Sequence, residues 1–233
     1  MAGNTVLIIA DMRFPEKVKK NLGKIGRLVQ FSAPGIVYDS ISGHPDIFLC
    51  HTPAGLVAAP NTPEKILSEI KKAFLRLIAG NEPVGYSYPS SARYNAFVCG
   101  SYLIHNTELT DSAILQQMSG SQIILVKQGY TRCNLVSAGD LFITSDRGIE
   151  KSLKGWNKEV FFVDPKPILL PGQKNGFFGG CAGYFNKRLY IAGGTGFFAE
   201  GAALKQALAI KGIELVELYD GPLWDGGGIF FET

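Results

Sequence analysis

One pattern of residues occurs five times along this chain, at intervals of roughly 40 to 50 residues. The most complete copies have a small or polar residue, an apolar stretch, a tight turn and a second apolar stretch. The residues that align at the start of the five copies are Asp46, Asn95, Asn134, Gly180 and Gly226. A repeat of this length is typical of folds that stack similar supersecondary units or arrange them in a ring. The repeat therefore restricts the fold more than any single motif does.

Each copy has the features of a β-hairpin. Gly100-Ser101 and Gly139-Asp140 place glycine first in a two-residue turn, which is typical of type II′ turns because their first central residue needs a positive φ. Asn186-Lys187 stands at the matching place in the fourth copy without a glycine. Apolar residues on both sides of each strand predict sheets that are covered on both faces.

A helix is predicted between successive hairpins, and an apolar strand after each helix. We expect helices at residues 15–22, 62–80, 111–118, 149–153 and 199–210. We expect the strands that follow them at residues 28–31, 84–88, 123–126, 160–163 and 215–218. In the second helix Thr62 is the expected N-cap, and Ile66, Ile70, Phe74 and Ile78 recur at helical spacing up to Gly80.

The two ends of the chain complete the predicted arrangement. The fifth hairpin is cut short at Thr233, and the apolar strand at 6–11 is expected to pair with residues 229–231. Such pairing closes a ring and removes open sheet edges. The sequence thus predicts one α/β domain over residues 1–233, a ring or α/β propeller of five helix–strand–hairpin modules with pseudo-fivefold symmetry. An ordinary α/β domain with a coincidental repeat is the alternative, whereas a plain β-propeller lacks a helix in each blade.

Composition and charge exclude several classes of function. The formal net charge is +3 and the basic residues form no stripe, so we expect no nucleic-acid partner. The apolar run after the first residues is too short for a signal peptide or a membrane helix, so we expect no membrane association. The 4 cysteines lack the close spacing of a disulfide framework or metal motif and predict reduced thiols in the cytoplasm. No cofactor is expected.

The architecture resembles the pentein, or guanidine-modifying enzyme (GME), superfamily. That superfamily includes arginine and agmatine deiminases, amidinotransferases, dimethylarginine hydrolases and a non-catalytic ribosome anti-association factor. The motif Leu223-Trp-Asp-Gly-Gly-Gly228 is similar to the glycine-rich start of its last module, and Arg93-Tyr-Asn95 and Arg132-Cys-Asn134 look like its Arg-Asp pairs. The resemblance implies that one central cavity is faced by Asp46, Arg93, Asn95, Arg132, Asn134 and Asp225.

The sequence departs from the catalytic pattern of the superfamily at three places. The enzymes carry a nucleophilic cysteine after the last glycine run, and residues 229–233 contain none. They carry a histidine in a middle module, and residues 132–138 contain none. Asn95 and Asn134 stand where acidic residues would hold a guanidinium, and an amide forms no charge-assisted pair. These departures argue against the chemistry of the superfamily.

The cysteines and histidines leave narrower alternatives open. Buried structural thiols are the favoured interpretation of all the cysteines, although Cys133 and Cys181 stand beside aligned positions and one of them is expected to border the pocket. Cys181 is the best candidate nucleophile, with His44 or His105 as its base. His44 and Asp46 share a face if they lie on a strand, as an acid–base or metal pair, but no third ligand has recognisable spacing and no metal site is predicted.

We therefore expect a non-canonical small-molecule binding protein with a polar pocket on the pseudo-fivefold axis and an amino-acid or guanidino-like ligand. In this hypothesis Asp46 and Asp225 are anionic anchors, Arg93 and Arg132 hold a carboxylate, and Asn95 and Asn134 set orientation. Trp224 beside Asp225 suits a cationic group, with core packing as the equal alternative. The alternatives are a non-catalytic protein or ribosome interaction module, and a divergent hydrolase or amidinotransferase that uses Cys181 on a guanidino or amidino group.

Overall fold

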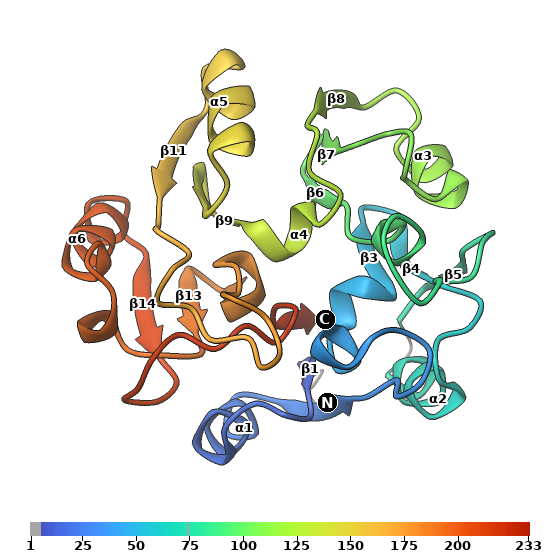
Figure 1. The fold of residues 1–233 in the computed structure, drawn as a ribbon, viewed down its shortest axis with the longest axis horizontal. Helices are drawn as coiled ribbons and strands as arrows, with labels where there is room; N and C mark the ends of the chain where they lie inside the picture. Colours follow the sequence, from blue (N-terminus) through green and yellow to red (C-terminus); the bar gives the residue numbers. More distant parts are fainter. Residues whose placement is uncertain (1–5, 74) are drawn as a thin grey trace, which may run out of the picture.

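The computed structural model describes residues 6–73 and 75–233, and in them five three-stranded sheets surround a central axis (Figure 1). The inner strands contact one another around this axis in the order β3, β6, β9, β12 and β15. Four modules have the same order, which is β3 (Leu49–Thr52), β4 (Gly55–Ala58), α2 (Glu64–Lys72) and β5 (Leu77–Ala79) in the first of them. The predicted α/β ring of five modules is confirmed.

The other modules repeat this plan. The second consists of β6 (Phe97–Cys99), β7 (Tyr102–His105), α3 (Ser112–Gln117) and β8 (Gln122–Leu125). The third consists of β9 (Leu135–Ala138), β10 (Leu141–Thr144), α5 (Arg147–Gly155) and β11 (Glu159–Phe162). The fourth consists of β12 (Ala182–Phe185), β13 (Arg188–Ile191), α6 (Gly201–Ile210) and β14 (Glu214–Glu217). In each, the hairpin strands are antiparallel and the strand after the helix runs parallel to the middle strand.

The fifth module joins the two ends of the chain. It consists of β15 (Phe230–Glu232), β1 (Leu7–Asp11), α1 (Glu16–Leu22) and β2 (Arg27–Phe31). β15 pairs antiparallel with β1, with Ile8 opposite Phe231, as the sequence predicts. This pairing brings the C-terminal strand to the axis, where Figure 1 marks the C-terminus.

The hairpin turns follow their sequences. Gly100 and Gly139 have φ of 56° and 59°, and neither following residue has a positive φ, which is the type II′ pattern. Asn186 and Lys187 both have positive φ, at 49° and 58°, so the fourth module uses the type I′ pattern instead.

The second helix and the strand after it correct the sequence prediction. α2 ends at Lys72, Ile78 lies in β5 and the expected strand at 84–88 is irregular, while Phe74 lies outside the described residues. β5 begins at Leu77, earlier than the expected residue 84, because Leu77 is the residue that pairs with Leu56 of β4. The short segment after α2 therefore leads directly into the strand. The N-cap position is Pro63, without a side-chain capping bond, so the assignment of Thr62 as N-cap is wrong.

Short helical turns lie in the loops that lead to the inner strands. They are η1 (Asp39–Ile41), η2 (Pro45–Ile47), η3 (Ser90–Ala92), α4 (Thr131–Asn134) and η4 (Gly179–Cys181), with η5 (Thr195–Phe197) before α6. α4 lies close to the axis in Figure 1 and contacts η4. The aligned residues of the repeat therefore stand on turns or loops just before the inner strands. No helix in the described part of the chain is long and apolar enough to cross a membrane.

Candidate functional site

Polar side chains, all but one of them buried, meet on the axis where these turns come together. We call them the central cluster: Asp11, His44, Asp46, Asn95, Arg132, Cys133 and Asp225. Asp11 ends β1, the others stand in or beside η2, β6, α4 and β15, and all but Arg132 are buried. Five aspartate, histidine and asparagine side chains at 1% exposure or less must find partners within the protein or in a ligand.

Asn95 and Cys133 connect η2 to α4. The Cys133 thiol donates to Asp46 Oδ2 at 2.9 Å. The Asn95 side chain donates from Nδ2 to the Asp46 carbonyl oxygen at 3.1 Å and contacts the Cys133 sulfur at 3.2 Å. Its Oδ1 accepts from the Cys133 backbone N–H at 3.1 Å. Asn95 thus holds the Asp46 backbone and Cys133 in fixed positions relative to each other.

His44 lies between two carboxylates on the other side of the cluster. Its Nε2 is 4.0 Å from Asp11 Oδ2 and 3.8 Å from Asp225 Oδ1. Asp11 is paired with Arg13, whose Nη2 is 2.6 Å from its Oδ2. Asp225 accepts from the backbone N–H of Phe177 at 2.8 Å and of Gly227 at 3.0 Å. Neither ring nitrogen of His44 has a hydrogen-bond partner among the described residues.

Burial dominates the electrostatics of the cluster. It raises the pKa of Asp46 to about 6 against the opposing charge of Arg132, and it raises the pKa of Asp225 to about 6 against that of His44. Burial lowers the pKa of His44, and it raises the pKa of the Cys133 thiol, which the nearby aspartates raise further. Without a further positive charge, the Cys133 thiol stays protonated at neutral pH.

Arg132 also lines a pocket. This axial pocket has a volume of about 210 Å³, and its polar lining includes His51, Arg132, Ser137, Tyr184 and Glu232. A smaller space of about 40 Å³ shares His51, Arg132 and Phe230 with this pocket. The guanidinium lies 5.3 Å from the Phe230 ring centre and donates from Nη1 to the Gly179 carbonyl oxygen at 3.0 Å.

Two glycines of the last module allow this close packing. Gly227 and Gly228 have φ of 67° and 82°, which favour glycine over any residue with a side chain. A Cβ on Gly227 would meet His44 and lie 2.7 Å from Asp46 Oδ1, and one on Gly228 would lie 2.8 Å from Arg132 Nη2. Because these two residues lack a Cβ, the side chains of His44, Asp46 and Arg132 can pack directly against the backbone of the last module.

The structure brings together His44, Asp46, Asn95, Arg132 and Asp225 from the predicted set, but two of the other residues lie elsewhere. Arg93 is at the rim, where its Nη1 contacts Glu82 Oε2 at 3.4 Å and the Pro83 carbonyl oxygen at 3.2 Å. Trp224 packs against the apolar cluster that contains Ile8 and Phe14. Arg93 and Trp224 occupy the expected positions in the repeat, but their side chains point away from the central cluster.

Asn134 and the candidate nucleophile Cys181 are buried beside the cluster, with their polar atoms used locally. Asn134 donates to the Tyr130 carbonyl oxygen at 2.9 Å and accepts from Ser145 at 3.1 Å. The Cys181 thiol donates to the Phe177 carbonyl oxygen at 3.2 Å, and burial raises its pKa well above the ordinary value. No hydrogen bond joins Cys181 to a histidine in residues 6–73 and 75–233.

Three further details differ from the sequence interpretation. His44 is the N-cap residue of η2 and Asp46 lies within η2, so the two residues are not on a strand. Asp11 joins the cluster because β1 completes the fifth module, and its place at the end of a buried strand was the available signal. Cys133, of the two cysteines beside aligned positions, is the one in contact with the Asp46 carboxylate.

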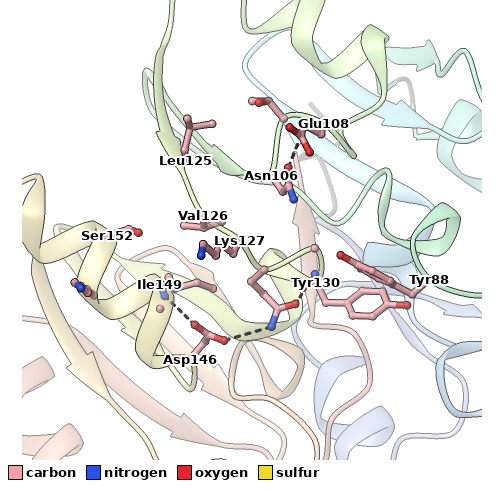
Figure 2. A pocket seen from close by; sticks show the side chains of 15 residues that line it. Tyr88, Asn106, Glu108, Leu125, Val126, Lys127, Tyr130, Asp146, Ile149 and Ser152 are labelled. Atoms are coloured by element: carbon pink, nitrogen blue, oxygen red, sulfur yellow. Dashed lines mark hydrogen bonds between the residues drawn. The ribbon is translucent and has the colours of Figure 1, made fainter.

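A second hollow lies between the second and third modules and is shown in Figure 2. This intermodule groove has a volume of about 1030 Å³ and lies between β8 and α5. The Tyr88 and Tyr130 rings lie together at one end, with centres 5.9 Å apart. Asp146 accepts from the Ile149 N–H at 2.8 Å as the cap of α5, and also from Gln128. Its carboxylate is thus used by the fold, while Glu108, Lys127 and Lys151 also line the groove.

Comparison with known proteins places the chain in a family. A family model described as "Family of unknown function (DUF6873)" matches residues 9–230. The chain belongs to this family. None of the curated proteins is a match by sequence.

Solved structures show the fold. A Pseudomonas aeruginosa DDAH mutant complexed with citrulline is similar with a TM-score of 0.57 and 10% identity, over 91% of both chains. An agmatine deiminase from C. jejuni has a TM-score of 0.53 and 8% identity, over 91% of this chain and 86% of that one. SxtG, an amidinotransferase from Microseira wollei, has a TM-score of 0.50 and 10% identity, over 91% and 88%. The pentein fold predicted from the sequence is confirmed.

Proposed function

We propose that this protein binds a small amino-acid-like or guanidino compound in the axial pocket. The observation that carries the proposal is that Arg132 and Glu232, residues of opposite charge, line the same pocket. A volume of about 210 Å³ suits a metabolite of amino-acid size. A pocket with one cationic and one anionic wall is complementary to a molecule that carries both charges.

Arg132 is the receptor for the carboxylate of the ligand. In the described residues its side-chain hydrogen bonds use Nη1 alone, which leaves donors at Nη2 for a charge-assisted bond. Phe230 under the guanidinium and Gly228 beside it hold the planar group in place. The pocket therefore offers a pre-positioned donor, which reduces the entropy cost of binding.

Glu232 is the receptor for the cationic group of the ligand. Its side chain is 7% exposed and lies 3.3 Å from His51 Nδ1 at the more exposed side of the pocket. Asp46 and Asp225, the anionic anchors expected from the sequence, line none of the described pockets, so the proposal gives their role to Glu232. Arg93, at the rim, has no part in it.

The structural neighbours support this class of ligand. The DDAH structure contains citrulline, and an agmatine deiminase from the same comparison has its substrate bound. Those properties belong to the neighbours, and at their low sequence identity they suggest which compounds to try rather than which one binds.

A thermal-shift series with graded ligands tests the proposal. Arginine and citrulline carry a carboxylate, whereas agmatine lacks it, so arginine and citrulline should stabilise the protein and agmatine should not. Saturation at 100 times the dissociation constant adds about 2.7 kcal/mol. Ureido product and ammonia are measured in the same wells, and their formation would show that the protein is an enzyme and not only a binding protein. Equal stabilisation by agmatine would contradict the role of Arg132, and no shift from any compound would favour the interaction-module alternative.

Two matched substitutions locate the site. Glu232→Gln removes a charge-assisted contact and should weaken binding about 10-fold to 100-fold, with little loss of stability. Arg93→Gln changes an arginine at the rim and should leave binding as it is. Loss of binding in Arg93→Gln with normal binding in Glu232→Gln would place the site elsewhere.

A further inference from the structure

The central cluster contains polar atoms that the protein leaves without partners. Five buried side-chain nitrogen or oxygen atoms in the described residues have none, and three of them are His44 Nδ1, His44 Nε2 and Asp46 Oδ1. His44 is 1% exposed and Asp46 is 0% exposed. An unpaired polar atom at such depth costs about 1–3 kcal/mol, so three in one place indicate an occupant.

The unpaired atoms lie beside a third side chain with metal-binding chemistry. His44, Asp46 and Cys133 are all buried, and one ligand atom from each lies within 4.8 Å of the other two. No other set of three histidine, cysteine, aspartate or glutamate side chains in residues 6–73 and 75–233 meets in this way. One nitrogen, one carboxylate oxygen and one sulfur form a set that suits zinc, which accepts all three types.

The protein also holds these side chains in place. Asn95 contacts both the Asp46 backbone and Cys133, and Gly227 leaves room for His44 and Asp46. Such outer contacts orient ligands at metal sites. Asp225 Oδ1, 3.8 Å from His44 Nε2, is the fourth group beside the set.

The fixed charges of the cluster favour a divalent cation. Three carboxylates, from Asp11, Asp46 and Asp225, face two guanidinium groups, from Arg13 and Arg132. With a neutral histidine and a thiol this leaves one excess negative charge in a buried space. A divalent cation bound by a cysteine thiolate removes that excess, whereas a water molecule would pair the orphan atoms and leave it.

We propose that His44, Asp46 and Cys133 form a buried site for Zn²⁺ or a similar divalent transition metal, a proposal that does not rest on ligand binding in the axial pocket. Binding replaces the thiol proton of Cys133 by the metal and releases that proton to solvent. The site lies behind Arg132 and joins η2 to α4, so its main effect is on the stability of the axis.

Cobalt binding to the full chain tests the site. The reduced protein, freed of metal by a chelator, is titrated with Co²⁺ and then Zn²⁺. We expect a single equivalent of Co²⁺ with the charge-transfer absorption of a cobalt–thiolate bond, displaced by an equivalent of Zn²⁺. This measurement on the unmodified protein requires no variant to fold. Absence of binding, or cobalt bound without thiolate absorption, would overturn the proposal.

Cysteine variants identify the thiolate. Cys133→Ser should abolish the charge-transfer absorption and weaken metal affinity by about 100-fold or more. Cys181→Ser is the matched control, because Cys181 is also buried and its thiol donates to the Phe177 carbonyl oxygen, away from the metal-ligand set. Asp46→Asn should weaken affinity and keep the absorption. Absorption that survives Cys133→Ser, or is lost in Cys181→Ser, would refute the assignment. Circular dichroism checks the fold, and the ligand series above, run without metal, separates this outcome from that of the axial pocket.

Discussion

The two ends of the central axis differ although the same five modules build both. At one end the turns η2, α4 and η4 cover His44, Asp46, Cys133 and Asp225 almost completely. At the other end the inner strands stop without long loops, and the axial pocket remains with Glu232 at its wall. Arg132 stands between the two ends and belongs to both.

The difference indicates that the closed end of the axis acts on the stability of the fold, whereas the open end is where a ligand would bind. The closed end holds charges at a depth where each needs a partner, so substitutions there act mainly on folding. The open end has Glu232 and the more exposed His51 at the wall of a pocket, so we expect substitutions there to act mainly on a ligand. This contrast can be tested by pairs of variants that differ in which end they reach.

The largest effect is expected from the removal of the shared cation. Arg132→Met leaves Asp46 and Asp225 buried without their positive neighbour, and it should lower the free energy of unfolding by about 3–5 kcal/mol. Arg93→Met is the control, because Arg93 forms a partly exposed pair at the rim and should cost less than about 1 kcal/mol. Urea unfolding measures both. Equal costs would mean that Arg132 is not electrostatically coupled to the closed end.

A smaller effect is expected from the glycine run. Gly227→Ala places a methyl group against His44 and Asp46 and also strains a positive φ, for a total of about 3 kcal/mol. Gly100→Ala strains a similar φ in open space and should cost about 1 kcal/mol. The difference between the two costs isolates the packing against the cluster. If both variants lose the same stability, the contact is not tight.

His105 belongs to neither end, and its protonation is expected to lower the free energy of unfolding at acid pH. Burial lowers its pKa to about 4, so it is neutral in the native state at pH 6 while the unfolded state begins to take up a proton. The free energy of unfolding should therefore decrease as pH falls from about 6.5 towards 4, by at most about 3 kcal/mol from this histidine. Unfolding curves across this range, compared with His105→Gln, measure it. A flat difference between the two proteins would contradict the lowered pKa.

The smallest effect is expected at the open end. The hydrogen bond to Glu232 raises the pKa of His51, so His51 is protonated and paired with Glu232 at lower pH. The protonated ring competes with a cationic ligand group, and affinity should rise a few-fold as pH increases through that pKa. Calorimetric titration with arginine at several pH values measures the trend. The His51→Asn variant should show no such change of affinity with pH. An affinity that falls as pH increases would contradict the proposal that Glu232 binds the cationic group.

Periodicity in the sequence was sufficient for most of the fold. The hairpin turns at Gly100 and Gly139, the helices between hairpins and the pairing of the two chain ends were all predicted, because hydrophobic spacing and turn chemistry are local properties. β5 was misplaced because its register with β4 depends on a partner strand and not on its own residues.

The residue pattern was enough to predict the ring and the residues that begin each module. Which side chains meet depends on contacts between modules: the turn of η2 brings His44 to Asp46, the closure by β1 adds Asp11, and α4 directs Cys133 to the cluster. It also directed Arg132 into the pocket and Arg93 to the rim, although both precede an asparagine in the same motif. Side-chain direction at the axis depends on how the loops of neighbouring modules pack together, and the periodicity within one module does not encode that packing.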